Sequence, residues 1–143
     1  MFAVPPNTIL LPADPAAAHP VRIAREYATD PDRWRRELRY RADQRFVRLL
    51  ERTPDHEVWL MSWLPGQCTE PHDHGGPTGA FTVVFGVLTE SVFGRDGAVE
   101  AVHVLHGGQS RAFGPNYVHQ VSNDGPDPAV SIHVFRPGRL HHP

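Results

Sequence analysis

Residues 66–86, GQCTEPHDHGGPTGAFTVVFG, contain a His-x-His pair, His72 and His74, followed by small residues and an aromatic, β-branched run. On an extended strand, residues i and i+2 point to the same face, so two imidazoles at this spacing can bind one metal ion. The run FTVVF at 81–85 has the composition of a β-strand. The alternative is a pair of surface histidines in a loop rich in Gly and Pro, and the residues downstream argue against it.

The bulk composition indicates an ordinary soluble protein. The chain has 143 residues, of which 40% are hydrophobic and 21% charged, with a formal net charge of -2. These values favour one domain with its own core. They do not indicate a nucleic-acid-binding surface or a membrane span. The single cysteine, Cys68, excludes an intrachain disulfide, and we expect a cytoplasmic protein. Ten histidines justify a search for metal ligands.

The N-terminal part differs in character from the rest. Residues 1–18 are rich in Pro and Ala, which predicts an extended arm, and residues 19–143 are expected to form a single domain. A helical lead-in over about 20–42 contains one helix at roughly Pro20–Ala28 and a second that begins after Asp30, an N-cap residue. The arginines of the second helix are interpreted as a solvated face, with anion binding as the alternative.

The pattern then becomes β from residue 44 to about 137. Residues 44–64 predict a hairpin, because Pro54-Asp55-His56 separates two runs of strand composition. Further short strands are predicted at 81–85, 87–93, 99–105, 111–113, 118–121 and 129–135. Many short strands with no later helix are typical of an all-β sandwich or barrel.

The spacing of the Gly and His residues resembles the two motifs of the cupin superfamily. The first runs from Gly66 through His72 and His74 to Gly79 and Gly86, and the second from Gly108 through Gly114 and His119 to Asn123. The resemblance implies a cupin barrel, a double-stranded β-helix or jelly roll, with short N-terminal helices. Many cupins bind their metal through three His and one Glu, and the Glu position is Gly79 here. The implied ligands are therefore His72, His74 and His119.

Further motifs resemble the thiol dioxygenases, and cysteine dioxygenase in particular. They are Trp63-x-x-Gly66, the HDH at 72–74, His119 and the closing SIHVF-x-P at 131–137. This resemblance implies a mononuclear Fe(II) that uses O2 as co-substrate to convert L-cysteine, a small-molecule thiol, to cysteine sulfinate. Three neutral imidazoles leave Fe(II) its full charge, which suits a thiolate donor. Neither a nucleic-acid nor a membrane partner is expected, and the oligomeric state stays open.

The resemblance also assigns a substrate-binding arginine. In this family an arginine on the strand before the metal motif holds the substrate carboxylate, and alignment places it at Arg48. The planar guanidinium suits a carboxylate because it can donate two parallel hydrogen bonds. The alternative is that Arg48 pairs with Glu51 or Glu57 on the sheet surface. Arg45, three residues earlier, is expected to point to the other face.

The closing strand carries three further residues with implied roles. Ser131 and His133 match a family relay that orients a tyrosine hydroxyl, and the tyrosine position is Phe135. The missing phenol removes a hydrogen-bond donor and a candidate acid. Two alternatives follow: a variant oxygenase of specialised metabolism with another thiol or product, and a non-catalytic metal-binding cupin. His133 taken alone also fits a satisfied core histidine, and Cys68 a small buried or loop residue.

Overall fold

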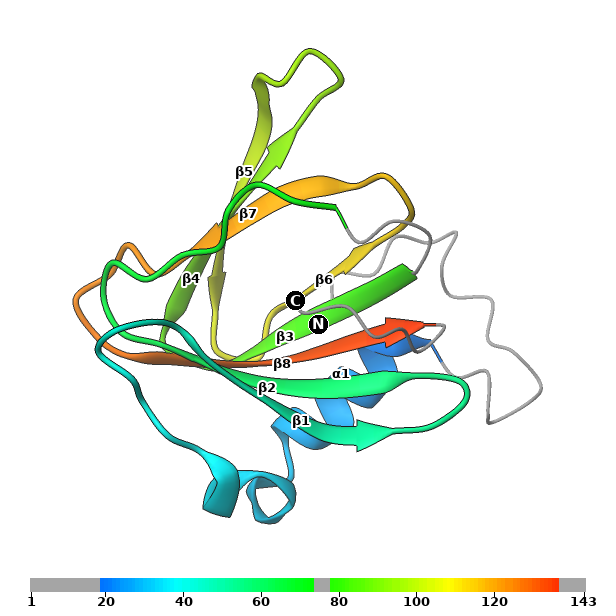
Figure 1. The fold of residues 1–143 in the computed structure, drawn as a ribbon, viewed down its shortest axis with the longest axis vertical. Helices are drawn as coiled ribbons and strands as arrows, with labels where there is room; N and C mark the ends of the chain where they lie inside the picture. The colour runs from blue at the N-terminus through cyan, green and yellow to red at the C-terminus, as the bar shows by residue number, and fades with distance from the viewer. Residues whose placement is uncertain (1–18, 74–77, 137–143) are drawn as a thin grey trace.

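The computed structural model describes residues 19–73 and 78–136. The predicted arm at 1–18, His74 and the terminal histidines lie outside these residues. The described chain contains one α-helix, two short 3-10 turns and eight strands (Figure 1). In chain order they are α1 (Pro20–Ala28), η3 (Pro31–Arg33), η4 (Arg35–Glu37), β1 (Phe46–Arg52), β2 (Glu57–Trp63), β3 (Thr78–Phe85), β4 (Val87–Phe93), β5 (Val99–His106), β6 (Ser110–Phe113), β7 (Val118–Ser122) and β8 (Ala129–Arg136).

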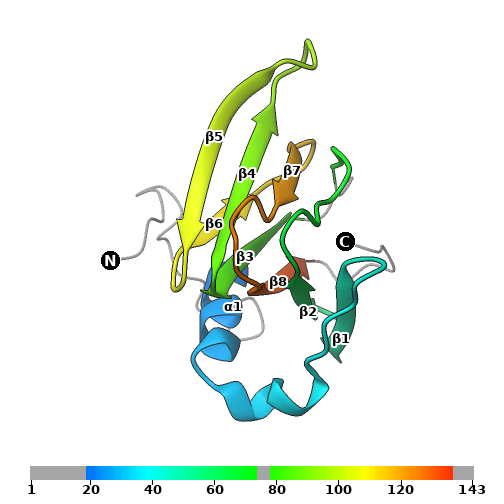
Figure 2. The same ribbon diagram turned by 90° about the vertical axis from the view of Figure 1, so that its left-hand side faces the viewer.

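The strands form two antiparallel sheets. The larger has the order β1-β2-β8-β3-β6, and the smaller has the order β5-β4-β7. Residues 68–72, which follow β2, run along β7 and pair with it at two isolated bridges, Cys68 with Ser122 and His72 with His119. The hairpin of β4 and β5 extends beyond the rest of the molecule (Figures 1 and 2). The prediction of an all-β fold is confirmed, and so is the hairpin at 44–64.

The larger sheet is buried on both faces, because α1 covers one of them and the smaller sheet lies over the other (Figure 2). Residues of β2 alternate between the two sides: Trp59 and Met61 belong to the cluster between the sheets, whereas Val58 and Leu60 pack towards α1. Burial on both faces explains why β2 is a nearly continuous apolar run rather than a clean alternation. The face between the sheets is the one that carries the candidate site.

The helical lead-in is partly as predicted. Helix α1 has the predicted bounds, but the second predicted helix is wrong, because two 3-10 turns replace it. Asp30 makes no side-chain hydrogen bond to the turn that follows, and the φ of -144° at Trp34 interrupts helical geometry. The indole of Trp34 is buried and donates a 2.8 Å hydrogen bond to the carbonyl oxygen of Tyr27 in α1. The packing of Trp34 against α1 therefore overrides the helix propensity of the residues around it.

In the residues that the structure describes, no helix has the length and apolar character needed to cross a membrane.

Candidate metal centre

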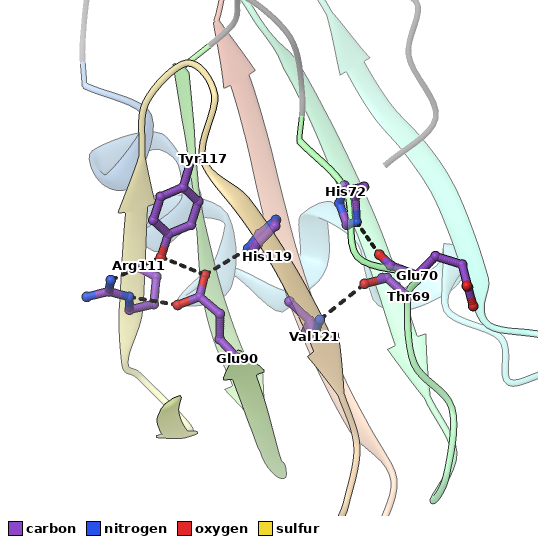
Figure 3. Close-up of polar contacts among 8 residues, drawn as sticks. All are labelled: Thr69, Glu70, His72, Glu90, Arg111, Tyr117, His119 and Val121. Carbon is purple, nitrogen blue, oxygen red and sulfur yellow. Dashed lines mark hydrogen bonds and ion pairs between the residues drawn. The ribbon is translucent and has the colours of Figure 1, made fainter. Parts of the chain in front are cut away.

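The fold brings together two of the predicted metal ligands, His72 and His119. His119 lies on β7, and His72 lies on the segment that leads towards β3. Two backbone hydrogen bonds join them, from His72 N to His119 O (3.0 Å) and from His119 N to His72 O (2.9 Å). Their ring centroids are 4.9 Å apart (Figure 3). His74, the third predicted ligand, is outside the described residues. No group of three candidate ligand side chains is gathered within 19–73 and 78–136.

Each of the two imidazoles is oriented by a hydrogen bond at Nδ1. In His72 this nitrogen lies 2.7 Å from the carbonyl oxygen of Glu70, and in His119 it lies 2.8 Å from Oε2 of Glu90. A carbonyl oxygen only accepts hydrogen bonds, so Nδ1 of His72 carries the proton. The other ring nitrogen, Nε2, is then the one with a lone pair for a metal ion. The donor set of the described residues therefore fits a metal bound by imidazole nitrogens.

The electrostatics of the pair favour neutral imidazole at His72. Burial lowers the pKa of His72, and nearby His119 and Arg45 lower it further, although the hydrogen bond to Glu70 opposes this effect. A histidine must be neutral to bind a metal. The lowered pKa therefore keeps His72 neutral, and able to bind a metal, at neutral pH and somewhat below it.

Glu90, on β4, is a buried carboxylate behind His119. Its Oε1 accepts a 2.9 Å hydrogen bond from Nε of Arg111, and its Oε2 accepts one of 3.1 Å from the hydroxyl of Tyr117 (Figure 3). Burial alone would raise the pKa of Glu90, but the hydrogen bond and charge of His119 and the charge of Arg111 outweigh it and lower the pKa. Burial, together with the charge of Glu90, raises the pKa of Tyr117 to about 12.

A small cavity lies beside the two histidines. Its volume is about 10 Å³. A space of this size holds at most about one water molecule or an ion, so a bound amino acid would require neighbouring side chains to move. The lining residues are Met61, Trp63, Thr69, His72, His119, Val121 and His133.

His133 belongs to a buried hydrogen-bonded chain on β8. The indole Nε1 of Trp63 donates to Oγ of Ser131 (2.9 Å), and this oxygen lies 2.7 Å from Nε2 of His133. The indole N–H only donates, so the Ser131 oxygen accepts from Trp63 and also forms the hydrogen bond with the His133 ring. The ring of His133 stacks on Phe81 at a centroid distance of 4.9 Å. The structure therefore places His133 at the cavity, with Ser131 hydrogen-bonded to its ring; the predicted roles of both residues remain predictions.

Phe135, the residue that the resemblance matches to a family tyrosine, lies on the same strand. It is buried, and its ring centroid is 6.0 Å from that of Phe113. Its β8 position pairs with Gly79 of β3. The side chain thus belongs to the apolar cluster between the sheets.

The structure does not bring Arg48 to the cavity with the histidines. Arg48 pairs with Leu60 across the β1–β2 ladder, and Leu60 packs towards α1. The exposed guanidinium forms an ion pair with Glu37 of η4 rather than with Glu51 or Glu57. The register of β1 turns Arg48 to the outer face of the sheet, and its role as substrate anchor stays a prediction.

Arg45 is the arginine that the structure brings near the site. Its guanidinium lies 5.1 Å from the Trp63 ring centroid, and its Nη1 is 3.3 Å from Sδ of Met61. Met61 and Trp63 both line the cavity of the histidines. Arg45 also lines an open groove of about 680 Å³. The other residues of this groove are Arg39, Arg41, Gln44, Phe46, Val47, Arg48 and Cys68.

Cys68 is exposed in the segment outside the strands, in agreement with a loop residue.

Gly79 shows why a carboxylate ligand is absent from β3. A Cβ atom at Gly79 would lie 2.6 Å from Cζ of Phe113 and 2.6 Å from the carbonyl oxygen of Val134. Both distances are well inside van der Waals contact, so any side chain here would displace Phe113 or the β8 backbone.

We expect Gly79→Ala to destabilise the fold by about 1–3 kcal/mol, the usual cost of overpacking a core. Urea unfolding would measure the change. Gly114→Ala is the matched control, because nothing lies within 4 Å of its Cβ position, and its expected effect is within about 0.5 kcal/mol. Equal stability of the two variants would contradict the packing at Gly79.

Sequence reasoning missed Glu90, Arg111 and Tyr117. It placed Arg45 on the face opposite Arg48 but gave it no role. A signal for Glu90 was present in the β4 sequence VLTESVF. Leu88, Glu90 and Val92 are all buried and share one face of this strand. A carboxylate in the middle of an apolar face requires partners, so the pattern indicated a buried polar network.

Comparisons with known proteins identify the family and the fold of the chain. The family model of cysteine dioxygenase type I matches residues 13–140. Among solved structures, the fold is similar to the protein TT1209 from Thermus thermophilus, with a TM-score of 0.65 and 22% identity over 73% of this chain and 94% of that one. A Klebsiella pneumoniae protein with a double-stranded β-helix domain gives a TM-score of 0.65 and 23% identity over 75% and 89%.

KdgF from Halomonas sp. gives a TM-score of 0.62 and 20% identity, covering 73% of this chain and 91% of that one. At these identities the structural neighbours show the fold alone, which is the double-stranded β-helix of the cupins. The family match extends over most of the sequence, including both described histidines. The chain therefore belongs to the cysteine dioxygenase type I family.

Proposed function

We propose that this protein is a mononuclear Fe(II) thiol dioxygenase that oxidises L-cysteine to cysteine sulfinate. The observation that carries the proposal is the pairing of His72 and His119, each with Nδ1 in a hydrogen bond, beside a cavity in a chain of the cysteine dioxygenase family. The reaction adds both atoms of O2 to the thiol sulfur, so cysteine and O2 together account for every atom of the product. We expect it to take place in the cytoplasm.

The ligands proposed for Fe(II) are His72, His74 and His119. Imidazole nitrogens suit Fe(II), and three protein ligands leave positions open on the metal. When bound, Fe(II) would supply the redox chemistry that joins O2 to a thiol. The protein contributes orientation and an apolar wall, because Met61 and Val121 line the cavity beside the histidines.

Arg45 is the proposed anchor for the substrate carboxylate. It is a half-buried cation in contact with two residues of the cavity wall. Burial lowers the pKa of Arg45, yet a guanidinium stays charged at physiological pH. A carboxylate on this cation would be bound by charge-assisted hydrogen bonds, which are stronger than neutral ones. Arg48, by contrast, is exposed and paired with Glu37, so its guanidinium is a weaker candidate for binding the carboxylate.

A second candidate, favoured by Phe135, is an oxygenase with another thiol or another product. Phe135 packs against Phe113 and brings no hydroxyl to the apolar cluster. A substrate group or a water molecule would then have to occupy the place of the family phenol. A third candidate is a non-catalytic cupin that binds a small ligand through its metal.

An oxygen-uptake assay with a panel of thiols separates the three candidates. Fe(II)-loaded protein would be given L-cysteine, 3-mercaptopropionate or cysteamine, with protein without added iron as the control. We expect uptake with cysteine above that with the other two thiols. Faster uptake with another thiol would favour the second candidate. Binding of thiols without any uptake would contradict the dioxygenase and leave the non-catalytic cupin.

A further inference from the structure

Glu90 has a buried carboxylate whose oxygens are engaged by three side chains. Its side chain is fully buried, and Arg111, Tyr117 and His119 all lie within 3.1 Å of its two oxygens. Nη2 of Arg111 also donates to the Tyr117 hydroxyl at 3.2 Å, which closes the network (Figure 3). A buried charge is costly unless it is paired and hydrogen-bonded, so this arrangement holds Glu90 in a single place.

The hydrogen bond to His119 defines which ring nitrogen carries the proton. An ionised carboxylate can only accept hydrogen bonds, and the guanidinium of Arg111 at 2.9 Å favours the ionised form of Glu90. The proton between Glu90 and His119 therefore resides on Nδ1 of His119. Nε2 is then left with the lone pair, as it is in His72, whose ring centroid is 4.9 Å away.

Glu90 also brings a negative charge to a site that has no carboxylate on β3. Three histidines form a neutral ligand set, and Gly79 has no room for a side chain. The carboxylate of Glu90 does not contact the metal position. Its negative charge acts on the site through its hydrogen bond to the imidazole of His119. A hydrogen-bonded carboxylate raises the basicity of a histidine ligand and holds its ring in place.

We propose that Glu90 is a positioning residue of the metal site, which fixes the ring and the tautomer of His119 and supplies the negative charge that the ligand set lacks. Arg111 and Tyr117 in turn hold Glu90. The inference rests on the proposed function to the extent that His119 is a metal ligand.

Two measurements on the metal-free protein and its Co(II) complex test this proposal. Nitrogen-15 NMR of the metal-free wild type should show His119 protonated at Nδ1, with the signal assigned by its loss in His119→Gln. A neutral His119 ring with its proton on Nε2 and none on Nδ1 would overturn the proposal. This measurement needs no variant of Glu90, so it decides the question even if such a variant does not fold.

Co(II) titration followed by visible absorption gives the second measurement. We expect Glu90→Gln to weaken Co(II) binding about 10–100-fold and to alter the absorption bands, and Tyr117→Phe to have a smaller effect in the same direction. Glu100→Gln, an exposed glutamate on β5, is the matched control and should bind as the wild type does. A folded Glu90→Gln protein with wild-type affinity and spectrum would overturn the proposal.

Co(II) binding by His119→Gln distinguishes a failure of the proposed metal site from a failure of the role proposed for Glu90. If wild type and His119→Gln bind Co(II) equally well, His119 is not a ligand, and the metal site itself is contradicted. If wild type binds Co(II) and His119→Gln does not, the site stands, and Glu90→Gln alone decides the role of Glu90.

Discussion

His72→Ala should abolish iron binding and thiol oxidation together. The substitution removes a proposed ligand that is half-buried and lies outside the named strands. The backbone hydrogen bonds that join residue 72 to His119 remain, so the expected damage to the fold is small. Loss of a partner behind a ligand costs about 10–100-fold in affinity or activity, and loss of the ligand itself should exceed that range. Iron content after anaerobic reconstitution and the rate of O2 uptake with cysteine would both be measured.

The matched control is His106→Ala, an exposed histidine at the end of β5. It should retain the iron content and rate of the wild type. Metal addition should also raise the melting temperature of the wild type, because a ligand that binds only the folded state stabilises it, and His72→Ala should lose this increase. Full iron content and activity in His72→Ala would exclude His72 from the site.

Arg45→Gln should weaken the use of cysteine far more than Arg48→Gln does. A hydrogen bond to a charged group contributes about 1.5–3 kcal/mol, which corresponds to a rise in KM for cysteine of about 10–150-fold. Arg48 is exposed and paired with Glu37, and exposed ion pairs contribute little, so its loss should change KM less than about threefold.

Cysteamine provides the control for this comparison, because it is a thiol amine without a carboxylate. If Arg45 binds the carboxylate, Arg45→Gln should lower the rate with cysteamine much less than the rate with cysteine. An equal loss with both thiols would indicate damage to packing on Trp63 instead. A large effect at Arg48 with none at Arg45 would show that the sequence alignment, and not the β1 register of the structure, identifies the anchor.

The elements of the barrel were predictable because short strands leave a strong local signal. The turn residues between β1 and β2, and the alternation along β4, depend on the residues themselves and not on distant partners. The second helix was not predictable in this way. Trp34 contacts α1 through its indole, and a tertiary contact of this kind can override local propensity.

The candidate site was predictable in its motifs but not in its surroundings. His72 and His119 were predicted as ligands because the spacing of their motifs resembles the cupins. The assignment of Arg48 depended in addition on which face of β1 points inwards. A shift of one residue in a strand exchanges its two faces, and the β1–β2 ladder contains an irregularity between Leu49 and Glu51. Register of this kind is set by the pairing of two strands, so the sequence of β1 alone does not reveal it.

The most direct test of the dioxygenase proposal is the product formed from L-cysteine under 18O2 by Fe(II)-loaded protein. We predict cysteine sulfinate that carries two labelled oxygen atoms, with one O2 consumed for each cysteine. A product that is only cystine, or a sulfur oxide whose oxygen comes from water, would contradict a thiol dioxygenase.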